Sequence, residues 1–226
     1  KTGIKPVVPI RQSGAGKGSL PKEEVKEEGL FSSDMLAQLN TVFGKMEKDI
    51  LLKVYVKDDD VSKELLSYMT ELGKLTDKIS VEEVHDEVKA PVVEIHRDGE
   101  YSGLAFHGVP GGHEFNSFIL AILGLAGLGK KLEGEQLEKV ASVQKPLNIE
   151  TFVSLSCTHC PEVVQALNLI SSHNENITTS MVDSAVYFDE AKEKDIQAVP
   201  VVFINGKVAS VGEQTLEQLI TTIANA

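Results

Sequence analysis

The chain of 226 residues has no tryptophan, two cysteines, and fewer basic than acidic residues, with a formal net charge of -12. The acidic balance argues against nucleic acid or an anionic membrane as the main partner, because both need a cationic surface. The longest apolar run, residues 118–129, is too short to span a bilayer and contains three glycines. Two cysteines in a chain of this length do not make a secreted disulfide scaffold, so we expect a soluble cytoplasmic protein.

The first 30 residues differ from the rest of the chain. They are rich in proline, glycine and charged residues, and their apolar residues follow no helical or strand period. The glycines of Gly14–Ser19 lack the GxxxxGK[ST] spacing of a phosphate loop, and no strand precedes them. We interpret residues 1–30 as a flexible tail, a linker or a processed end, and leave them out of the fold prediction.

One pattern of helices and strands then occurs twice. The first copy is predicted as a helix from an Asp34 cap to about Lys48, a strand at 50–56, a helix with an apolar stripe from Val61 to Leu72, strands at 79–84, 92–95 and 101–106, and an apolar helix beginning near Gly112. The second is predicted as a helix at 136–143, a strand at 147–153, a helix at 161–172, a strand at 177–182, a short helix at 188–194, strands at 201–204 and 207–211, and a final helix with Leu216 and Ile223 on its apolar face.

Each copy therefore alternates helix and strand and ends in a hairpin. The hairpin turns are an Asp98-Gly99 step in the first copy and Asn205-Gly206 in the second. This order predicts an α/β fold with a parallel βαβ start, an antiparallel edge and helices on both faces of the sheet. It resembles the thioredoxin fold, so we expect two tandem thioredoxin-like folds, each a mixed central sheet flanked by helices, packed into one unit. Their predicted ranges are 31–145 and 146–226, with the first helix of the second fold near 133–143.

Both cysteines lie in one segment of the second copy, Cys157-Thr158-His159-Cys160-Pro161, between a predicted strand and a predicted helix. Dithiol exchange needs an attacking thiolate and a second thiol that resolves the mixed disulfide. The unpaired amides at the start of a helix favour the thiolate form. We expect Cys157 to be the exposed nucleophile and Cys160 to be the shielded resolving thiol. His159 either contributes a cation beside the thiolate or simply faces solvent, and the spacing leaves both open.

A zinc site is the main alternative for a CxxC pair. Structural zinc needs four ligands, and this chain has no second CxxC and no closely spaced histidine pair. A purely structural disulfide is also disfavoured, because a bridge across so short a loop constrains little of the unfolded chain. The composition therefore favours a redox pair with no bound metal.

Two further residues stand out at the starts of predicted elements. Pro200 begins a strand about forty residues after the cysteines, and we predict a cis peptide bond between Val199 and Pro200. In the thioredoxin fold, which the pattern resembles, this proline faces the CxxC loop. Glu114 follows His113 at the start of the last helix of the first copy. From the residues alone, this pair indicates a helix start with a carboxylate matched to the helix dipole rather than a catalytic group.

Three segments resemble the N-terminal domain of the flavoprotein subunit of bacterial alkyl hydroperoxide reductase. They are Ser154–Leu169, which contains the CxxC motif, Gly112-His113-Glu114-Phe115, and Val199–Lys207. The resemblance covers residues from about 31 to 226. It implies a tandem thioredoxin fold that takes electrons from a thioredoxin-reductase-like flavoprotein module and passes them to a peroxiredoxin, which reduces peroxides. It also implies that Glu114 reaches the CxxC region and tunes its reactivity.

The sequence departs from this family in two ways. Thr158-His159 stands where the family often has His-Asn, and no GxGxxG motif follows a strand, so FAD and NAD(P)H are expected only on a separate reductase module. Two other functions stay open. One is a general tandem-thioredoxin protein disulfide oxidoreductase, although that function would suit an active CxxC in each copy. The other is a docking module without enzymatic activity.

Overall fold

The computed structural model describes residues 30–226, so residues 1–29 of the predicted tail, with its glycine segment, lie outside this range. The first half contains α1 (Ser33–Phe43), β1 (Ile50–Val56), α2 (Asp60–Gly73), β2 (Ile79–His85), β3 (Val92–Arg97), β4 (Glu100–His107), a 3₁₀ turn (Gly112–Glu114), α3 (Phe115–Leu123) and a π-helical turn (Gly124–Leu128). The second half contains α4 (Gly134–Ala141), β5 (Leu147–Val153), α5 (Cys160–Ser171), β6 (Ile177–Asp183), α6 (Phe188–Glu193), β7 (Val201–Ile204), β8 (Lys207–Val211) and α7 (Leu216–Ala224).

One eight-stranded sheet runs through both halves, in the order β2-β1-β3-β4-β6-β5-β7-β8. In each half the first two strands pair in parallel and the other pairs are antiparallel, which confirms the predicted fold class. The halves are joined by β4 and β6, which pair in parallel from Leu104 opposite Thr179 to His107 opposite Val182. The sheet is continuous between the halves, so it does not mark a boundary between two folds. The predicted division between residues 145 and 146 stays a prediction.

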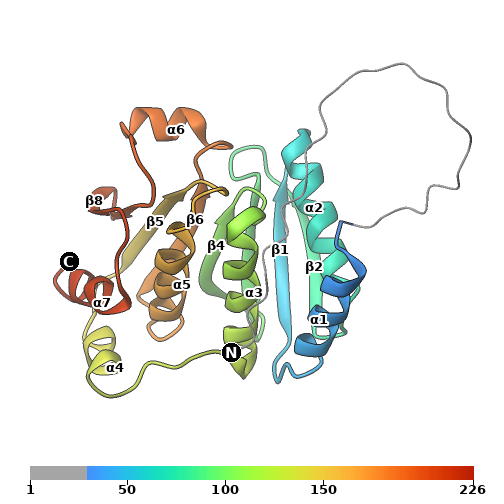
Figure 1. Cartoon of the computed structure of the whole chain (residues 1–226), viewed down its shortest axis with the longest axis horizontal. Coiled ribbons are helices and arrows are strands. Elements are labelled where there is room, and N and C mark those ends of the chain that lie inside the picture. The colour runs from blue at the N-terminus through green and yellow to red at the C-terminus, as the bar shows by residue number, and fades with distance from the viewer. Residues whose placement is uncertain (1–29) are drawn as a thin grey trace, which may run out of the picture.

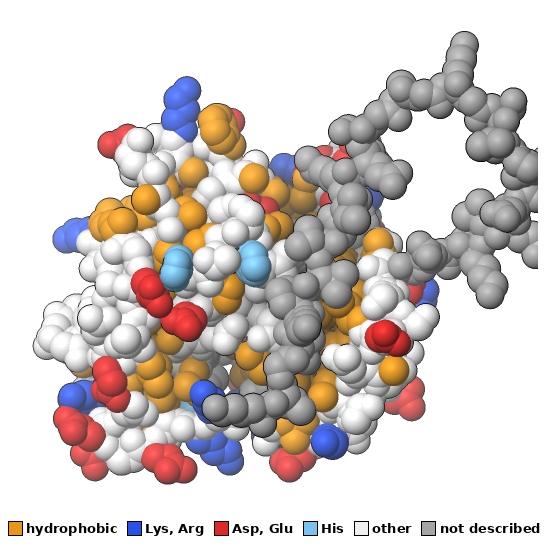
Figure 2. Space-filling model, viewed as in Figure 1, with side chains coloured by type: hydrophobic (Ala, Val, Ile, Leu, Met, Phe, Trp, Pro, Cys, Tyr) orange, Lys and Arg blue, Asp and Glu red, His pale blue; other side chains and the backbone are white. Residues whose placement is uncertain are grey.

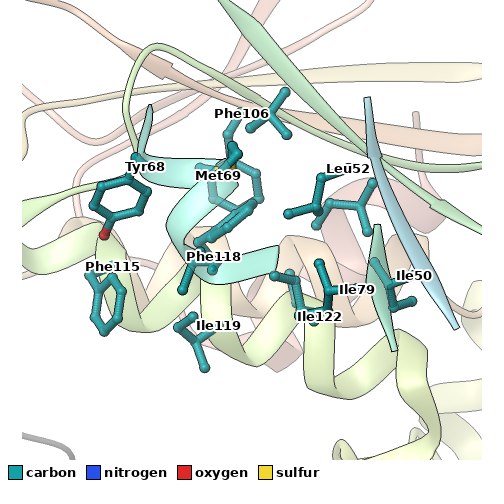
Figure 3. Packing of buried hydrophobic residues seen from close by; sticks show 14 of the residues in the cluster. Ile50, Leu52, Tyr68, Met69, Ile79, Phe106, Phe115, Phe118, Ile119 and Ile122 are labelled. Atoms are coloured by element: carbon teal, nitrogen blue, oxygen red, sulfur yellow. The ribbon is translucent and has the colours of Figure 1, made fainter. Parts of the chain in front are cut away.

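The main core lies between the sheet and the helices of the first half. Phe106 of β4 and Phe118 of α3 are both buried and meet edge to face, with ring centroids 5.0 Å apart. Figure 3 shows Met69 of α2 and Leu52 of β1 packed around them. In Figure 1, α3 and α5 lie in front of the sheet, and Gln165 of α5 donates a hydrogen bond to the Ser117 hydroxyl of α3 at 3.3 Å. The two halves therefore share a helix layer as well as a sheet.

The second face of the sheet is covered differently in the two halves. In the second half, Ala191 of α6 packs against Phe152, Val182 and Phe203 on this face. In the first half, Leu51, Lys53 and Tyr55 of β1 stay partly exposed on it. Within residues 30–226, α6 is the helix that covers this face, so the prediction of helices on both faces holds only for the second half.

Several predicted helix ends were wrong. The first helix begins at Ser33, because Ser32 rather than Asp34 is its N-terminal cap. It ends at Phe43 rather than Lys48, and Gly44 is its C-terminal cap. The Ser32 hydroxyl accepts a hydrogen bond from the Met35 amide at 3.3 Å, which satisfies one of the free amides of the first turn. The helix predicted at 136–143 spans Gly134–Ala141. Between residues 30 and 226, none of the helices is long and apolar enough to cross a bilayer.

Candidate functional site

Cys157 and Cys160 form a disulfide bond at the start of α5, with their Cα atoms 5.6 Å apart. The buried strand β5 ends at Val153, and the loop that follows brings Cys157 to the start of α5, where Cys160 is the first residue and Pro161 follows in the first turn. The Cys160 amide donates a hydrogen bond to the sulfur of Cys157 at 3.2 Å. A helix amide directed at this sulfur stabilises negative charge there, which is what a leaving or attacking thiolate requires.

The two cysteines differ in burial. Cys157 is partly exposed, whereas Cys160 is fully buried at 0% exposure. Cys160 and Val164, one helical turn further along α5, join the core cluster of the first half. A partner molecule can therefore reach Cys157 but not Cys160, and the shielded sulfur is held by packing between the halves.

A cis proline lies beside the exposed sulfur. The Val199–Pro200 peptide bond is cis, as predicted, and the Val199 carbonyl oxygen lies 3.9 Å from the sulfur of Cys157. The Ala90–Pro91 bond, at the equivalent place in the first half, is also cis, and this was not predicted. The two halves therefore share a cis proline at equivalent positions, although only the second half carries the cysteines.

The first half contributes a buried carboxyl group beside the CxxC loop. The amide of His113 donates a hydrogen bond to the Leu155 carbonyl oxygen at 2.9 Å, which ties the 3₁₀ turn to the loop before Cys157. Glu114, in the same turn, is 0% exposed, and neither of its carboxyl oxygens has a hydrogen-bond partner among the described residues. Burial raises the pKa of Glu114 to about 7, so this group can gain or lose a proton near neutral pH.

This geometry differs from the helix-start role that the residues alone suggested for Glu114. A carboxylate that only matches a helix dipole would be solvated at the surface. Periodicity could not reveal that Glu114 is buried, because one acidic residue at the start of an apolar helix usually indicates a helix cap. The GHEF resemblance was the signal that pointed to this position.

His159 lies on the solvent side of the loop. Its side chain is 65% exposed, and its Nδ1 atom lies 3.2 Å from a carboxylate oxygen of Glu213. Glu213 follows Gly212 at the end of β8, and the sequence analysis missed it because a single glutamate after a hairpin carries no pattern. His159 therefore has a neighbouring anion that partly holds its ring.

Within residues 30–226, no cluster of three or more histidine, cysteine or acidic side chains has the arrangement of a metal site. Each half opens with a parallel βαβ unit, whose strand-to-helix turn is Lys57-Asp58-Asp59 in the first half and the CxxC loop in the second, and neither turn contains glycine. A dinucleotide needs a glycine-rich turn at this position so that its phosphates can approach the backbone. Neither turn therefore has the glycine pattern of a dinucleotide-binding turn.

Comparisons with known proteins agree with this architecture. A thioredoxin-domain family model matches residues 147–225. A protein of Bacillus subtilis named NADH dehydrogenase is 38% identical over 87% of this chain and 38% of its own length. The AhpF protein of alkyl hydroperoxide reductase from Staphylococcus aureus strain NCTC 8325 is 36% identical, with the same coverage. This chain spans a little over a third of the length of these curated relatives.

Solved structures are similar to this chain over most of the described residues. The NTD_N/C domain of alkylhydroperoxide reductase AhpF from Enterococcus faecalis is 33% identical, with a TM-score of 0.80 over 85% of this chain and 99% of that one. A protein disulfide oxidoreductase from Aeropyrum pernix is 19% identical, with a TM-score of 0.76 over 85% of this chain and 92% of that one. The second likeness shows the fold alone.

Proposed function

The chain belongs to the family of the N-terminal domains of the alkyl hydroperoxide reductase AhpF, and from this we propose that it carries electrons between a flavoprotein reductase module and a peroxiredoxin. One observation supports this proposal above the others: the disulfide joins a partly exposed Cys157 to a buried Cys160 beside a cis proline. One cysteine is open to partners and the other can reach only its neighbour. A thiol pair that exchanges with other proteins needs this division of roles.

The proposed reaction begins from the reduced pair. The Cys157 thiolate attacks one sulfur of the disulfide in the oxidised peroxiredoxin, forms a mixed disulfide, and releases the other sulfur of that disulfide as a thiolate. The thiolate of Cys160 then attacks the sulfur of Cys157. This step restores the Cys157–Cys160 disulfide and releases the reduced partner. Two electrons leave the chain in each cycle, and a dithiol of the flavoprotein module returns them by the same exchange in reverse.

Glu114 has a proposed role in the second step. Cys160 must lose its proton before it can attack, and it lies in a dry environment where a charged group is costly. We propose that Glu114, on the turn that packs against the helix carrying Cys160, takes this proton and later returns it, since its pKa is about 7. Pro200 is proposed to position the partner at Cys157. His113 holds the loop through its amide, and the exposed ring of His159 lies 3.2 Å from a Glu213 carboxylate oxygen at the rim of the site.

The flavin and the nicotinamide cofactor supply hydride and electron chemistry, which we propose takes place on the separate reductase module. The residues of this chain perform the thiol steps only. We further propose a reducing cytoplasmic setting, where such a pair is cycled rather than kept permanently oxidised.

The test is to trap the mixed disulfide. Cys160→Ser leaves Cys157 able to attack but removes the resolving thiol, so incubation with a disulfide-form bacterial peroxiredoxin should give a covalent complex that reductant dissolves. Cys157→Ser is the matched control and should give no complex. Failure of Cys160→Ser to form the complex, while the same variant still reacts with a small disulfide, would exclude the peroxiredoxin as the acceptor. Rapid reduction of insulin by the native chain in the same experiment would favour a general disulfide oxidoreductase.

A further inference from the structure

The carboxyl group of Glu114 is buried without a donor to compensate its charge. The acidic side chains visible in Figure 2 lie at the molecular surface, where water solvates them. Glu114 differs, since it is 0% exposed and both of its oxygens are without a hydrogen-bond partner among the described residues. An ionised carboxylate in such a place is costly unless a donor stabilises it. A base must nevertheless be ionised before it accepts a proton, so a donor close to Glu114 is required.

The side chain of Ser117 brings a donor to the same side of the helix. The 3₁₀ turn that ends at Glu114 continues directly into α3, and residues three positions apart are neighbours on a helix surface. Ser117 is also 0% exposed. Burial raises the pKa of Glu114, and the Ser117 hydroxyl has the opposite, smaller effect. The structure therefore buries one hydroxyl group beside one carboxyl group.

Gln165 of α5 fixes the role of this hydroxyl. Its side-chain amide donates a hydrogen bond to the Ser117 oxygen at 3.3 Å, and this is the one hydrogen bond of the hydroxyl within residues 30–226. A serine hydroxyl has one proton to donate in addition to its acceptor positions. Because Ser117 accepts from Gln165, its own proton stays unused, while Glu114 has two oxygens without a donor. The unused donor and the unused acceptors thus belong to neighbouring buried residues.

The elements around Glu114 add no charge that competes with this pair. Its turn packs against α3, which has no acidic or basic residue, and against α5, where Glu162 is exposed. The titratable groups on this turn and on the segments around it are Tyr68, His113, Cys157, His159, Cys160 and Glu162. In the oxidised chain, burial and the Ser117 hydroxyl are the two influences on the pKa of Glu114. In the reduced chain, Cys160 and Glu114 share one proton.

We propose that Ser117, oriented by Gln165, is a positioning residue that donates a hydrogen bond to ionised Glu114 and keeps this carboxylate available to take the proton of Cys160. The inference rests on the proposed thiol exchange and adds two residues to it. Burial alone would leave Glu114 protonated at neutral pH and unable to act as a base. In the proposed step the proton passes from the sulfur of Cys160 to Glu114, and the resulting thiolate attacks the sulfur of Cys157. The hydrogen bond from Ser117 favours the state that precedes this transfer.

Infrared titration of the oxidised full chain tests the hydrogen bond without any thiol chemistry. The band of protonated Glu114 is the carboxyl band that Glu114→Gln lacks, and it should disappear with a midpoint near pH 7 in the native chain. Ser117→Ala should raise this midpoint by about one pH unit, as expected for loss of a hydrogen bond to a charged group. Ser117→Thr keeps a hydroxyl and should retain the native midpoint.

Two further variants test how the hydroxyl is oriented. Gln165→Leu, at a half-buried position, removes the amide donor and should shift the infrared midpoint in the same direction as Ser117→Ala. Asn116→Ala is the matched control, because a residue two positions from Glu114 does not face it on the helix. This control should leave the midpoint unchanged. Far-ultraviolet circular dichroism checks that each variant is folded, and Gln165→Leu carries the test if Ser117→Ala is not.

The pH profile of the second exchange step gives the functional readout. Reduced chain is mixed with dithiobis-nitrobenzoate: attack by Cys157 releases one coloured thiolate, and attack by Cys160 on the resulting mixed disulfide releases the second. A rise of the Glu114 midpoint by about one unit lowers its ionised fraction at pH 7 about fivefold. In Ser117→Ala the second release should therefore slow about fivefold at pH 7 and approach the native rate at pH 9. The first release should keep its native rate.

Three results would overturn the proposal. One is an infrared midpoint within roughly 0.3 pH unit of the native value in the folded Ser117→Ala or Gln165→Leu chain. Another is a second release that slows equally at pH 7 and pH 9, which would indicate a purely structural effect. The third is an infrared shift with no change in the second release. Failure of the proposed function is seen separately, because Cys160→Ser would then capture no peroxiredoxin while the infrared midpoints stay as expected.

Discussion

The amide of His113 donates a hydrogen bond to the carbonyl oxygen of Leu155 at 2.9 Å, and this contact ties the cysteine-free half to the loop that carries Cys157. Gly112 makes the approach possible. It has a φ of +54°, and a side chain at this position would collide with the backbone of Leu155. The geometry of the redox loop therefore depends on a glycine in the opposite half.

Gly112→Ala should consequently destabilise the fold more than an ordinary glycine substitution. We expect a loss of about 1 kcal/mol from the left-handed backbone and about 2 kcal/mol more from the collision with Leu155. Urea denaturation measures both. Gly134→Ala is the matched control, since Gly134 has a φ of +52° but no atom near the position of an added side chain. Equal losses of unfolding free energy in the two variants would show that the loop containing Leu155 shifts to accommodate the added side chain at no cost.

Glu114→Gln should remove a pH dependence of stability. The pKa of Glu114 is about 7 in the folded chain and near the ordinary value of 4.5 when unfolded, so the folded state binds the proton more tightly. Stability from this group is therefore fully present below pH 4.5 and is lost as the pH rises through 7. The loss amounts to at most about 3 kcal/mol.

Urea denaturation of both proteins at pH 5 and pH 8 provides the measurement. The native chain should lose stability relative to Glu114→Gln between these values. Burial also lowers the pKa of His107 to about 4, which costs stability below pH 6.5, but this effect is common to both proteins and cancels in the difference. A constant difference between the two proteins would mean that Glu114 does not titrate in this range.

Tyr187→Phe should weaken the connection between the halves. The Tyr187 hydroxyl donates a hydrogen bond to the Pro91 carbonyl oxygen at 3.0 Å, so the substitution should cost about 1 kcal/mol in the free energy of unfolding. Tyr101→Phe is the control, because Tyr101 is 40% exposed and its hydroxyl has no hydrogen bond within the described residues. If Tyr187→Phe is as stable as this control, the Tyr187 hydroxyl does not stabilise the contact between the halves.

The reduced chain should react with alkylating reagents in a fixed order. Cys157 is partly exposed and Cys160 is fully buried, so brief treatment with iodoacetamide should modify Cys157 first. Peptide mass spectrometry identifies the modified residue. Under denaturing conditions both cysteines should react, which confirms that the order comes from the fold. Early modification of Cys160 in the native state would contradict the proposed division of roles.

The sequence predicted the strands better than the helix ends. The ranges of β1 and β5 agree with the prediction, because both are apolar runs with polar or proline residues close to their ends. The end of α1 was missed because its pattern continues past Phe43, although Gly44 forms the cap. Local periodicity reports which residues favour an element, whereas the end of a helix depends on capping contacts that differ by single atoms.

The contacts between the halves lay beyond sequence reasoning. The pairing of β4 with β6 joins residues more than seventy positions apart, and no local signal specifies it. The burial of Glu114 and the contact between His159 and Glu213 have the same origin, since each depends on where a distant segment docks. The cis bond at Pro200 was predicted because the CxxC motif supplied a context, and the bond at Pro91 was missed because its half has no cysteines.

The continuous sheet also limits how the disulfide can move relative to the rest of the fold. No hinge separates the halves, because β4 and β6 are hydrogen-bonded along their shared length and α3 packs on α5. The disulfide cannot swing from one partner to another by bending inside this body. If the chain carries electrons as proposed, the eight strands described within residues 30–226 move together between the partners, or the partners come to a stationary Cys157.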